Sequence, residues 1–98
     1  MSGSLPQKVI DQMRKVGLPT SGLHQFQPRM TTNVRGDPMI EKRTVSKGPK
    51  QGKRGYVDEL GRIWIRDRAH AVVPDHWDVQ IAEGDDYFRV DDDGNELA

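Results

Sequence analysis

Histidines, carboxylates and arginines are concentrated in one segment of the chain, between Tyr56 and Val90. These residue types suit acid–base chemistry on a phosphodiester. A base removes the proton of the 2′-hydroxyl, an acid protonates the leaving oxygen, and cations stabilise the charged transition state. This combination is what a small ribonuclease without a metal ion or other cofactor needs. The candidate catalytic residues are His70, Asp75, His76, Asp78 and Glu83.

The residue types also suggest roles. A histidine has an ordinary pKa of about 6.5 and can act as the acid, whereas a carboxylate beside like charges can act as the base. We assign Asp78 as the base or as an orienting carboxylate, His76 or His70 as the acid, and Glu83 as a second candidate base. Arginine binds phosphate through bidentate hydrogen bonds. The candidate phosphate ligands in this segment are Arg66, Arg68 and Arg89.

A basic stretch, Lys47–Arg54, comes directly before this segment. Residues 1–54 carry a net charge of +8, and residues 55–98 carry −8. Such segregation favours a polyanionic partner for the first half, although the basic arm could instead neutralise the acidic half within the fold. We expect the arm to contact RNA through Lys50, Lys53 and Arg54.

The composition limits the fold. The 98 residues suggest a single domain, and a hydrophobic fraction of 34% with a mean hydropathy of −0.80 predicts a small core. The chain has no cysteine, which excludes disulfides and thiolate–zinc sites. No apolar run approaches the roughly 20 residues of a membrane span, and Met1–Ser4 lacks the features of a secretory signal.

The periodicity predicts an α+β fold, with one N-terminal helix, a long basic loop and a small, highly twisted antiparallel sheet. Ser4 and Gln7 form a capping-box pattern, and apolar residues at helical spacing then predict a helix over residues 5–16. Residues 20–54 show no sustained period beyond one short strand near 39–45. The remaining predicted strands are residues 56–57, 62–66, 76–81 and 85–90, with a two-residue hairpin loop at Asp93-Gly94.

The single domain is therefore predicted to contain a helix (residues 1–20), a basic irregular arm (21–54) and a catalytic sheet region (55–98). Residues 76–81 alternate between polar and apolar side chains, so the polar ones should share one face. Tyr87 or Arg89 of the next strand could reach the same face. The predicted polar face carries His76, Asp78 and Gln80, and the apolar face carries Trp77, Val79 and Ile81.

Two other functions fit parts of the pattern. A metal-dependent nuclease could use His70, Asp75, His76 and Asp78 as ligands, although their spacing matches no familiar metal motif. A non-catalytic module could bind RNA or the ribosome through the basic arm and leave the RNA intact. We favour the metal-independent ribonuclease, for which we expect neither a metal site nor a cofactor.

Two motifs support this choice. The stretch Lys50–Gly55, which leads into Gly-Arg-Ile-Trp64, and the strand His-Trp-Asp-Val-Gln80 resemble the ribonuclease domains of ribosome-cleaving colicins and pyocins. They also resemble the C-terminal nuclease domains of bacterial polymorphic toxins of the contact-dependent inhibition or Rhs type. Glu83-Gly84 and the Asp93-Gly94 turn extend the likeness over roughly residues 47–97.

The resemblance implies metal-independent cleavage of small-subunit ribosomal RNA. Asp78 matches the catalytic aspartate, and Glu83 is the nearest match to a catalytic glutamate. The family's histidine follows the Trp-Asp-x-Gln motif, where this chain has Ile81 and Ala82, so the acid would be His76 or His70. The resemblance also implies delivery from the producing cell as part of a larger toxin and action in the target-cell cytoplasm. It further implies a cognate immunity protein, with the domain occurring as a monomer or a toxin–immunity heterodimer.

Overall fold

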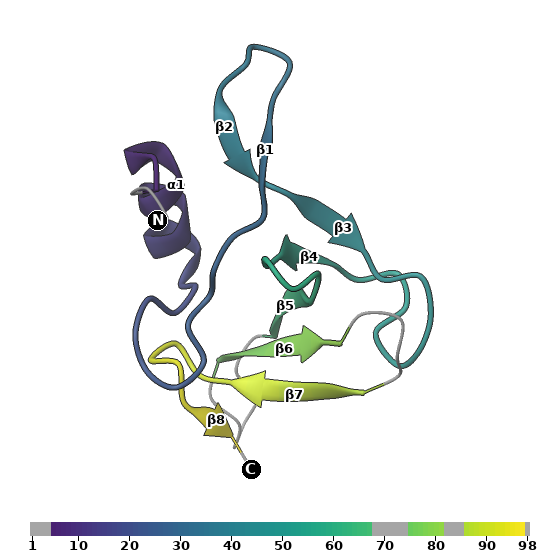
Figure 1. Ribbon diagram of the computed structural model, residues 1–98. Coiled ribbons are helices and arrows are strands. Elements are labelled where there is room, and N and C mark those ends of the chain that lie inside the picture. The colour runs from purple at the N-terminus through teal and green to yellow at the C-terminus, as the bar shows by residue number, and fades with distance from the viewer. Residues whose placement is uncertain (1–4, 68–74, 82–85, 98) are drawn as a thin grey trace.

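The computed structural model describes residues 5–67, 75–81 and 86–97. They form one helix, a two-stranded antiparallel sheet and a six-stranded antiparallel sheet (Figure 1). The predicted α+β class is confirmed, while the strong twist of the sheet stays a prediction. Within the described residues, no helix is both long and apolar enough to cross a membrane.

Helix α1, Gln7–Val16, packs Val9 and Met13 into the core. These two residues are four apart and therefore lie on the same face of the helix. The helix ends at Gly17, whose φ of 84° is the left-handed conformation that favours glycine. It begins two residues later than predicted, because Pro6 is the N-cap and its carbonyl accepts hydrogen bonds from the backbone of Val9 and Ile10. The N-cap is therefore Pro6 and not the predicted Ser4, which lies outside the described residues.

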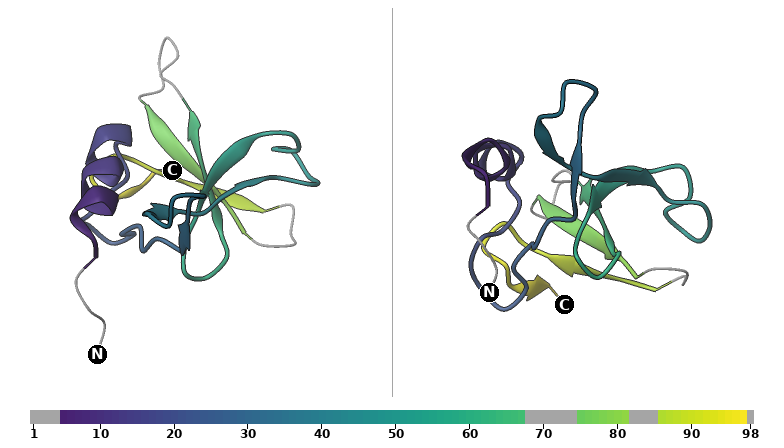
Figure 2. Two further views of the ribbon diagram at one scale, coloured as in Figure 1. Left: turned by 90° about the horizontal axis from the view of Figure 1, so that it is seen from above. Right: turned by 45° about the horizontal axis from the view of Figure 1, so that its top comes forward.

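The larger sheet is a meander in which every strand pairs with its neighbour in the sequence. Its strands are β3 (Lys42–Thr44), β4 (Arg54–Val57), β5 (Ile63–Asp67), β6 (His76–Gln80), β7 (Tyr87–Val90) and β8 (Glu96–Leu97). The smaller sheet is a hairpin of β1 (Met30–Thr32) and β2 (Pro38–Ile40). Helix α1 and the β3–β4 loop lie at opposite sides of the molecule (Figures 1 and 2).

Residues 20–54 contain three strands, where the sequence predicted at most one. Each of these strands has only three residues, and all residues of β1 and β3 are exposed. Such strands bury no face and leave no apolar alternation in the sequence. Within this segment, β3 pairs with β4 and so belongs to the larger sheet.

Three hairpin loops share one construction. Asn33, Asp58 and Asp91 each accept two backbone hydrogen bonds through Oδ1, and each is followed three residues later by a glycine with positive φ. At the last of these loops, the backbone N–H of Asp91 bonds to the carbonyl of Asn95. The connection is therefore a three-residue loop and not the predicted two-residue turn.

The core lies on one face of the larger sheet, where α1 also packs. It contains both tryptophans, Trp64 and Trp77, with Phe26, Val79 and Val90. A much smaller apolar cluster, formed by Val45, Ile63 and Ile65, lies on the other face. All five residues of β6 are buried, so this strand is covered on both sides.

The predicted alternation of β6 is confirmed within the strand. Trp77 and Val79 belong to the main core. Gln80 and Asp78 pair across the strands with Ile63 and Ile65, which places the polar side chains on the opposite face. Ile81 is the exception, because it follows the end of the strand and is 43% exposed.

The close approach of β4 and β5 gives a test of this packing. A Cβ at Gly55 would overlap the backbone carbonyl oxygen of Trp64. We expect Gly55→Ala to lower the free energy of unfolding by about 3 kcal/mol or more. The control Gly36→Ala adds its Cβ in open space and strains only a φ of 84°, for about 1 kcal/mol. Urea unfolding would measure both, and equal losses would contradict the close approach of the two strands.

Candidate active site

Three side chains with proton-transfer chemistry meet on the face of the sheet opposite the main core. His76 Nε2 lies 3.2 Å from Asp67 Oδ2 and 3.2 Å from Asp78 Oδ1. Asp67 and His76 are direct cross-strand partners in β5 and β6, and Asp78 is two residues further along β6. The antiparallel register therefore brings one imidazole between two carboxylates.

Two cations complete the cluster. Lys50 Nζ lies 2.8 Å from Asp78 Oδ2 and 4.6 Å from the ring centre of Tyr87. Arg89 Nε lies 3.8 Å from Asp78 Oδ1, because Arg89 is the cross-strand partner of Asp78 in β7. Asp78 is thus in contact with a histidine, a lysine and an arginine. We refer to Lys50, Asp67, His76, Asp78 and Arg89 as the carboxylate–histidine cluster.

Burial differs across the cluster. His76 and Asp78 are each only 1% exposed, whereas the Asp67 and Arg89 side chains are 33% and 43% exposed. The cluster therefore has a covered centre and a rim that solvent reaches. Lys50 belongs to the β3–β4 loop, so the basic stretch predicted to approach RNA contacts the centre directly.

The environment of Lys50 raises its pKa above the ordinary value of 10.5. Burial opposes this shift by penalising the charged ammonium, but the hydrogen bond and the negative charge of Asp78 outweigh it. Tyr87 and Asp67 raise the pKa further. Lys50 is therefore charged throughout the physiological range and holds its contact with Asp78.

Two of the predicted site residues lie elsewhere. Arg66 is the cross-strand partner of Trp77, which places it on the main-core face with its guanidinium 5.0 Å from the Trp77 ring centre. Its Nη2 lies 3.1 Å from Asp92 Oδ2 and 3.5 Å from Asp75 Oδ2, and these carboxylates raise the pKa of Arg66. The structure therefore brings Arg66 and Asp75 together with each other and not with Asp78.

The other predicted residues are distributed as follows. His70, Arg68 and Glu83 lie outside the described residues. Lys53 and Arg54 are exposed at the end of the β3–β4 loop and the start of β4. Gln80 is buried on the same face as Asp78, and Arg89 lies where alternation predicted it.

Sequence reasoning missed Asp67 as a member of the site. The signal was the hairpin register: when the strand of residues 62–66 pairs with that of 76–81, the residue after Arg66 comes opposite His76. The same register predicts that Arg66 faces away from Asp78, because neighbouring residues of a strand point to opposite faces.

The cluster also has the donor set of a cation site. One ligand atom from each of Asp67, His76 and Asp78 lies within 4.8 Å of the other two. Oxygen and nitrogen donors of this kind suit zinc or manganese. The ammonium of Lys50, at 2.8 Å from Asp78, places a competing positive charge there. Of the four ligands proposed from the sequence, His76 and Asp78 belong to this group, whereas Asp75 pairs with Arg66.

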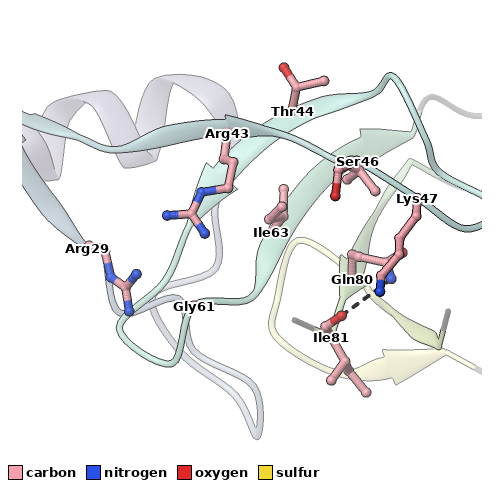
Figure 3. A pocket seen from close by; sticks show the side chains of 10 residues that line it. Arg29, Arg43, Thr44, Ser46, Lys47, Gly61, Ile63, Gln80 and Ile81 are labelled. Carbon is pink, nitrogen blue, oxygen red and sulfur yellow. Dashed lines mark hydrogen bonds between the residues drawn. The ribbon is translucent and has the colours of Figure 1, made fainter. Parts of the chain in front are cut away.

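A groove of about 690 Å³ adjoins the cluster at Gln80 (Figure 3). Its walls come from the segment before β1, from β3 and the loop after it, and from the ends of β5 and β6. The lining residues are Arg29, Arg43, Thr44, Val45, Ser46, Lys47, Gly61, Ile63, Gln80 and Ile81.

No protein-family model, no curated protein and no solved structure matches the chain. Two features of the described side chains bear on function. The carboxylate–histidine cluster contains acid–base groups, and the lining of the adjoining groove carries positive charge.

The contact between Lys50 and Asp78 predicts a pH dependence of stability. The pKa of Lys50 is raised on folding, so its contribution is complete below the unfolded pKa and is lost as the pH rises through the folded one. We expect Lys50→Met to lower the free energy of unfolding by roughly 2–3 kcal/mol near pH 8, because it leaves a buried carboxylate without its ammonium partner.

The difference between wild type and Lys50→Met should shrink once the pH exceeds about 10.5. Urea unfolding followed by tryptophan fluorescence, from about pH 8 to about pH 11.5, measures it. Lys53→Met removes an exposed lysine from the same loop and serves as the control, with a small difference at every pH. If the loss in the free energy of unfolding caused by Lys50→Met stayed constant to the highest pH, this would contradict an electrostatic contact between Lys50 and Asp78.

Proposed function

We propose that this chain is the ribonuclease domain of a bacterial toxin and that it cleaves RNA without a metal ion. The observation that carries the proposal is the set of contacts around buried Asp78, which adjoins His76, Lys50 and Arg89 on one sheet face. These are the residue types that transesterification at the 2′-hydroxyl requires, and each lies within contact distance of Asp78.

In the proposed reaction, the 2′-oxygen attacks the adjacent phosphorus and the bond from phosphorus to the 5′-oxygen breaks. The products are a 2′,3′-cyclic phosphate and a free 5′-hydroxyl. A carboxylate takes the proton of the 2′-hydroxyl, and His76 delivers a proton from Nε2 to the 5′-oxygen. Lys50 and Arg89 stabilise the negative charge that develops on the phosphoryl oxygens.

Asp78 and Asp67 differ in how deeply they are buried, and this difference suggests a different role for each carboxylate. Both oxygens of Asp78 face cationic or imidazole groups in the covered centre, which suits the orienting role. Asp67 reaches the same imidazole nitrogen from the solvent-exposed rim, which suits the base. The position of His76 between the two carboxylates supports its assignment as the acid.

His76 and Asp78 are buried, and Lys50 of the β3–β4 loop contacts Asp78, so movement of this loop is the proposed route of access to His76. Gly48 and Gly52 flank Lys50 and both have φ of 87°, a conformation that favours glycine. We propose that RNA phosphate draws Lys50 away from Asp78 and so opens the centre of the cluster.

The choice of ribosomal RNA as substrate rests on the resemblance of Lys50–Gly55 and His76–Gln80 to ribosome-cleaving toxin domains. The same resemblance supports an immunity protein as partner, delivery as part of a larger toxin, and action in the target-cell cytoplasm. A partner that covers the basic β3–β4 loop would hold Lys50 on Asp78 and keep the cluster closed.

Replacement of the central carboxylate tests the proposal. We expect Asp78→Asn to reduce cleavage of ribosomal RNA at least about 100-fold, because it removes the charge that orients His76 and Lys50. Primer extension on ribosomal RNA from cells induced to express the chain measures cleavage as new stops. Asp86→Asn removes an exposed carboxylate just before β7 and should leave the stops unchanged.

Thermal unfolding of both variants separates lost chemistry from lost folding. Full cleavage by a folded Asp78→Asn would contradict the site. If the wild type bound RNA without cutting it, this result would contradict the proposed reaction and favour a non-catalytic RNA-binding module. A single stop in the decoding region supports the ribosome-specific form, whereas scattered stops indicate a general ribonuclease.

A metal-dependent nuclease is the second candidate, and the convergence of Asp67, His76 and Asp78 favours it. Asp67, His76 and Asp78 would hold the metal, with Asp78 released from Lys50, and the chemistry supplied there would be activation of a water or of the 2′-hydroxyl. For the metal-independent enzyme, we expect cleavage of purified RNA to proceed at an unchanged rate in EDTA. Loss of cleavage in EDTA and its recovery on adding zinc or manganese would establish the metal-dependent reaction instead.

A further inference from the structure

The groove beside the carboxylate–histidine cluster plays no part in the reaction proposed above. Three cationic side chains, Arg29, Arg43 and Lys47, enter it from different segments (Figure 3). Among the described residues that line it, none is acidic. A concave surface with a single sign of charge concentrates the field and attracts polyanions.

The positions of the two arginines are set by the fold. Arg29 Nη2 donates a hydrogen bond to the carbonyl of Glu59 at 3.2 Å, and its backbone N–H bonds to the carbonyl of Val57. Arg43 Nη2 lies 2.9 Å from Glu41 Oε2. Among the described residues, the groove therefore has three cations in its lining and one carboxylate, that of Glu41, in an ion pair with one of them.

The groove also has an apolar side. Val45 and Ile63 belong to the small cluster beneath it, and Ile81 is 43% exposed at its edge. Cations together with apolar side chains match a sugar–phosphate backbone, in which charged phosphates alternate with less polar sugars and bases. A volume of about 690 Å³ is that of a small-ligand pocket and suits about one or two nucleotides of a single strand.

The groove lies next to the proposed reaction centre. Gln80 lines the groove and lies on the same face of β6 as Asp78, two residues away, which is about 7 Å along a strand. Gln80 Nε2 donates to the carbonyl of Ile81 at 3.4 Å, which holds the amide at the groove wall (Figure 3). One extended polynucleotide can therefore occupy both places.

We infer that this groove binds the sugar–phosphate backbone of single-stranded RNA next to the bond that is cut. The inference rests on the proposed ribonuclease function and adds the form of its substrate: an unpaired strand, held by Arg29, Arg43 and Lys47. Single strands expose both backbone and bases, whereas a duplex is too wide for a pocket of this size.

A binding measurement tests this independently of cleavage. The probe is a fluorescent 2′-O-methyl RNA oligonucleotide, which lacks the nucleophilic hydroxyl and cannot be cut. We expect Arg43→Gln and Lys47→Gln each to raise Kd roughly 3- to 10-fold, and each to reduce the slope of log K against log salt by about 0.7. Fluorescence anisotropy over a range of salt concentrations gives both quantities.

Arg35→Gln is the matched control, because Arg35 is an exposed arginine in the β1–β2 hairpin loop, outside the groove lining. Its Kd and salt slope should equal those of the wild type. Thermal unfolding confirms that each variant is folded. If Arg43→Gln and Lys47→Gln had the same Kd as the control, the inference would be overturned. It would also be overturned if the wild type bound a duplex of the same sequence as tightly as the single strand.

The two proposals can fail separately. If natural RNA is cut but the groove variants bind the oligonucleotide as the wild type does, the groove inference fails and the ribonuclease stands. If the groove variants lose binding but no RNA is cut, the groove is a nucleic-acid site and the ribonuclease proposal fails.

Discussion

The charge of Asp78 is the constraint on which the arrangement of this face of the sheet depends. Asp78 lies on a strand that is covered on both sides, where an ionised carboxylate is stable only with close partners. Lys50 supplies one partner from a loop that is distant in sequence, and His76 and Arg89 supply the others from β6 and β7. The β3–β4 loop thus contacts the sheet through this ion pair, through Lys50 above the Tyr87 ring and through Val45, which packs with Ile63 and Ile65.

An ion pair is a suitable contact for a loop that opens in the proposed reaction. An apolar side chain that leaves its packing site finds no new partner in water. The ammonium of Lys50, in contrast, can leave one anion and pair with another. In the proposed function, an RNA phosphate would compete with Asp78 for Lys50, so the charge that recruits the substrate would also uncover His76. The groove lined by Arg29, Arg43 and Lys47 would raise the local concentration of phosphate beside this loop, which joins recognition and opening in one step.

The sequence predicted the parts of this arrangement that depend on burial with a regular period. Trp77 and Val79 alternate with His76 and Asp78, and the structure places the two pairs on opposite faces, as predicted. Strand β1 was missed because an exposed three-residue strand leaves no apolar pattern, and the single strand predicted near residues 39–45 is in fact two strands, β2 and β3. Asp67 was missed, and Arg66 was placed with the wrong neighbours, because cluster membership depends on the cross-strand register of β5 and β6 and not on proximity in sequence.

Two buried aspartates show why Asp78 and not Asp58 is the candidate for chemistry. Both are 1% exposed. Asp58 accepts hydrogen bonds from the backbone of Leu60 and Arg62 and from the indole of Trp64, so most of its capacity is used by groups that keep their protons. These contacts close a hairpin loop and fix a core tryptophan, which is a structural role. The partners of Asp78 include an imidazole, a group that can take up and release a proton, and the ammonium of Lys50, which stays charged but can move to another anion. A carboxylate in contact with an imidazole can orient it and stabilise its charged form, which is the role proposed for Asp78.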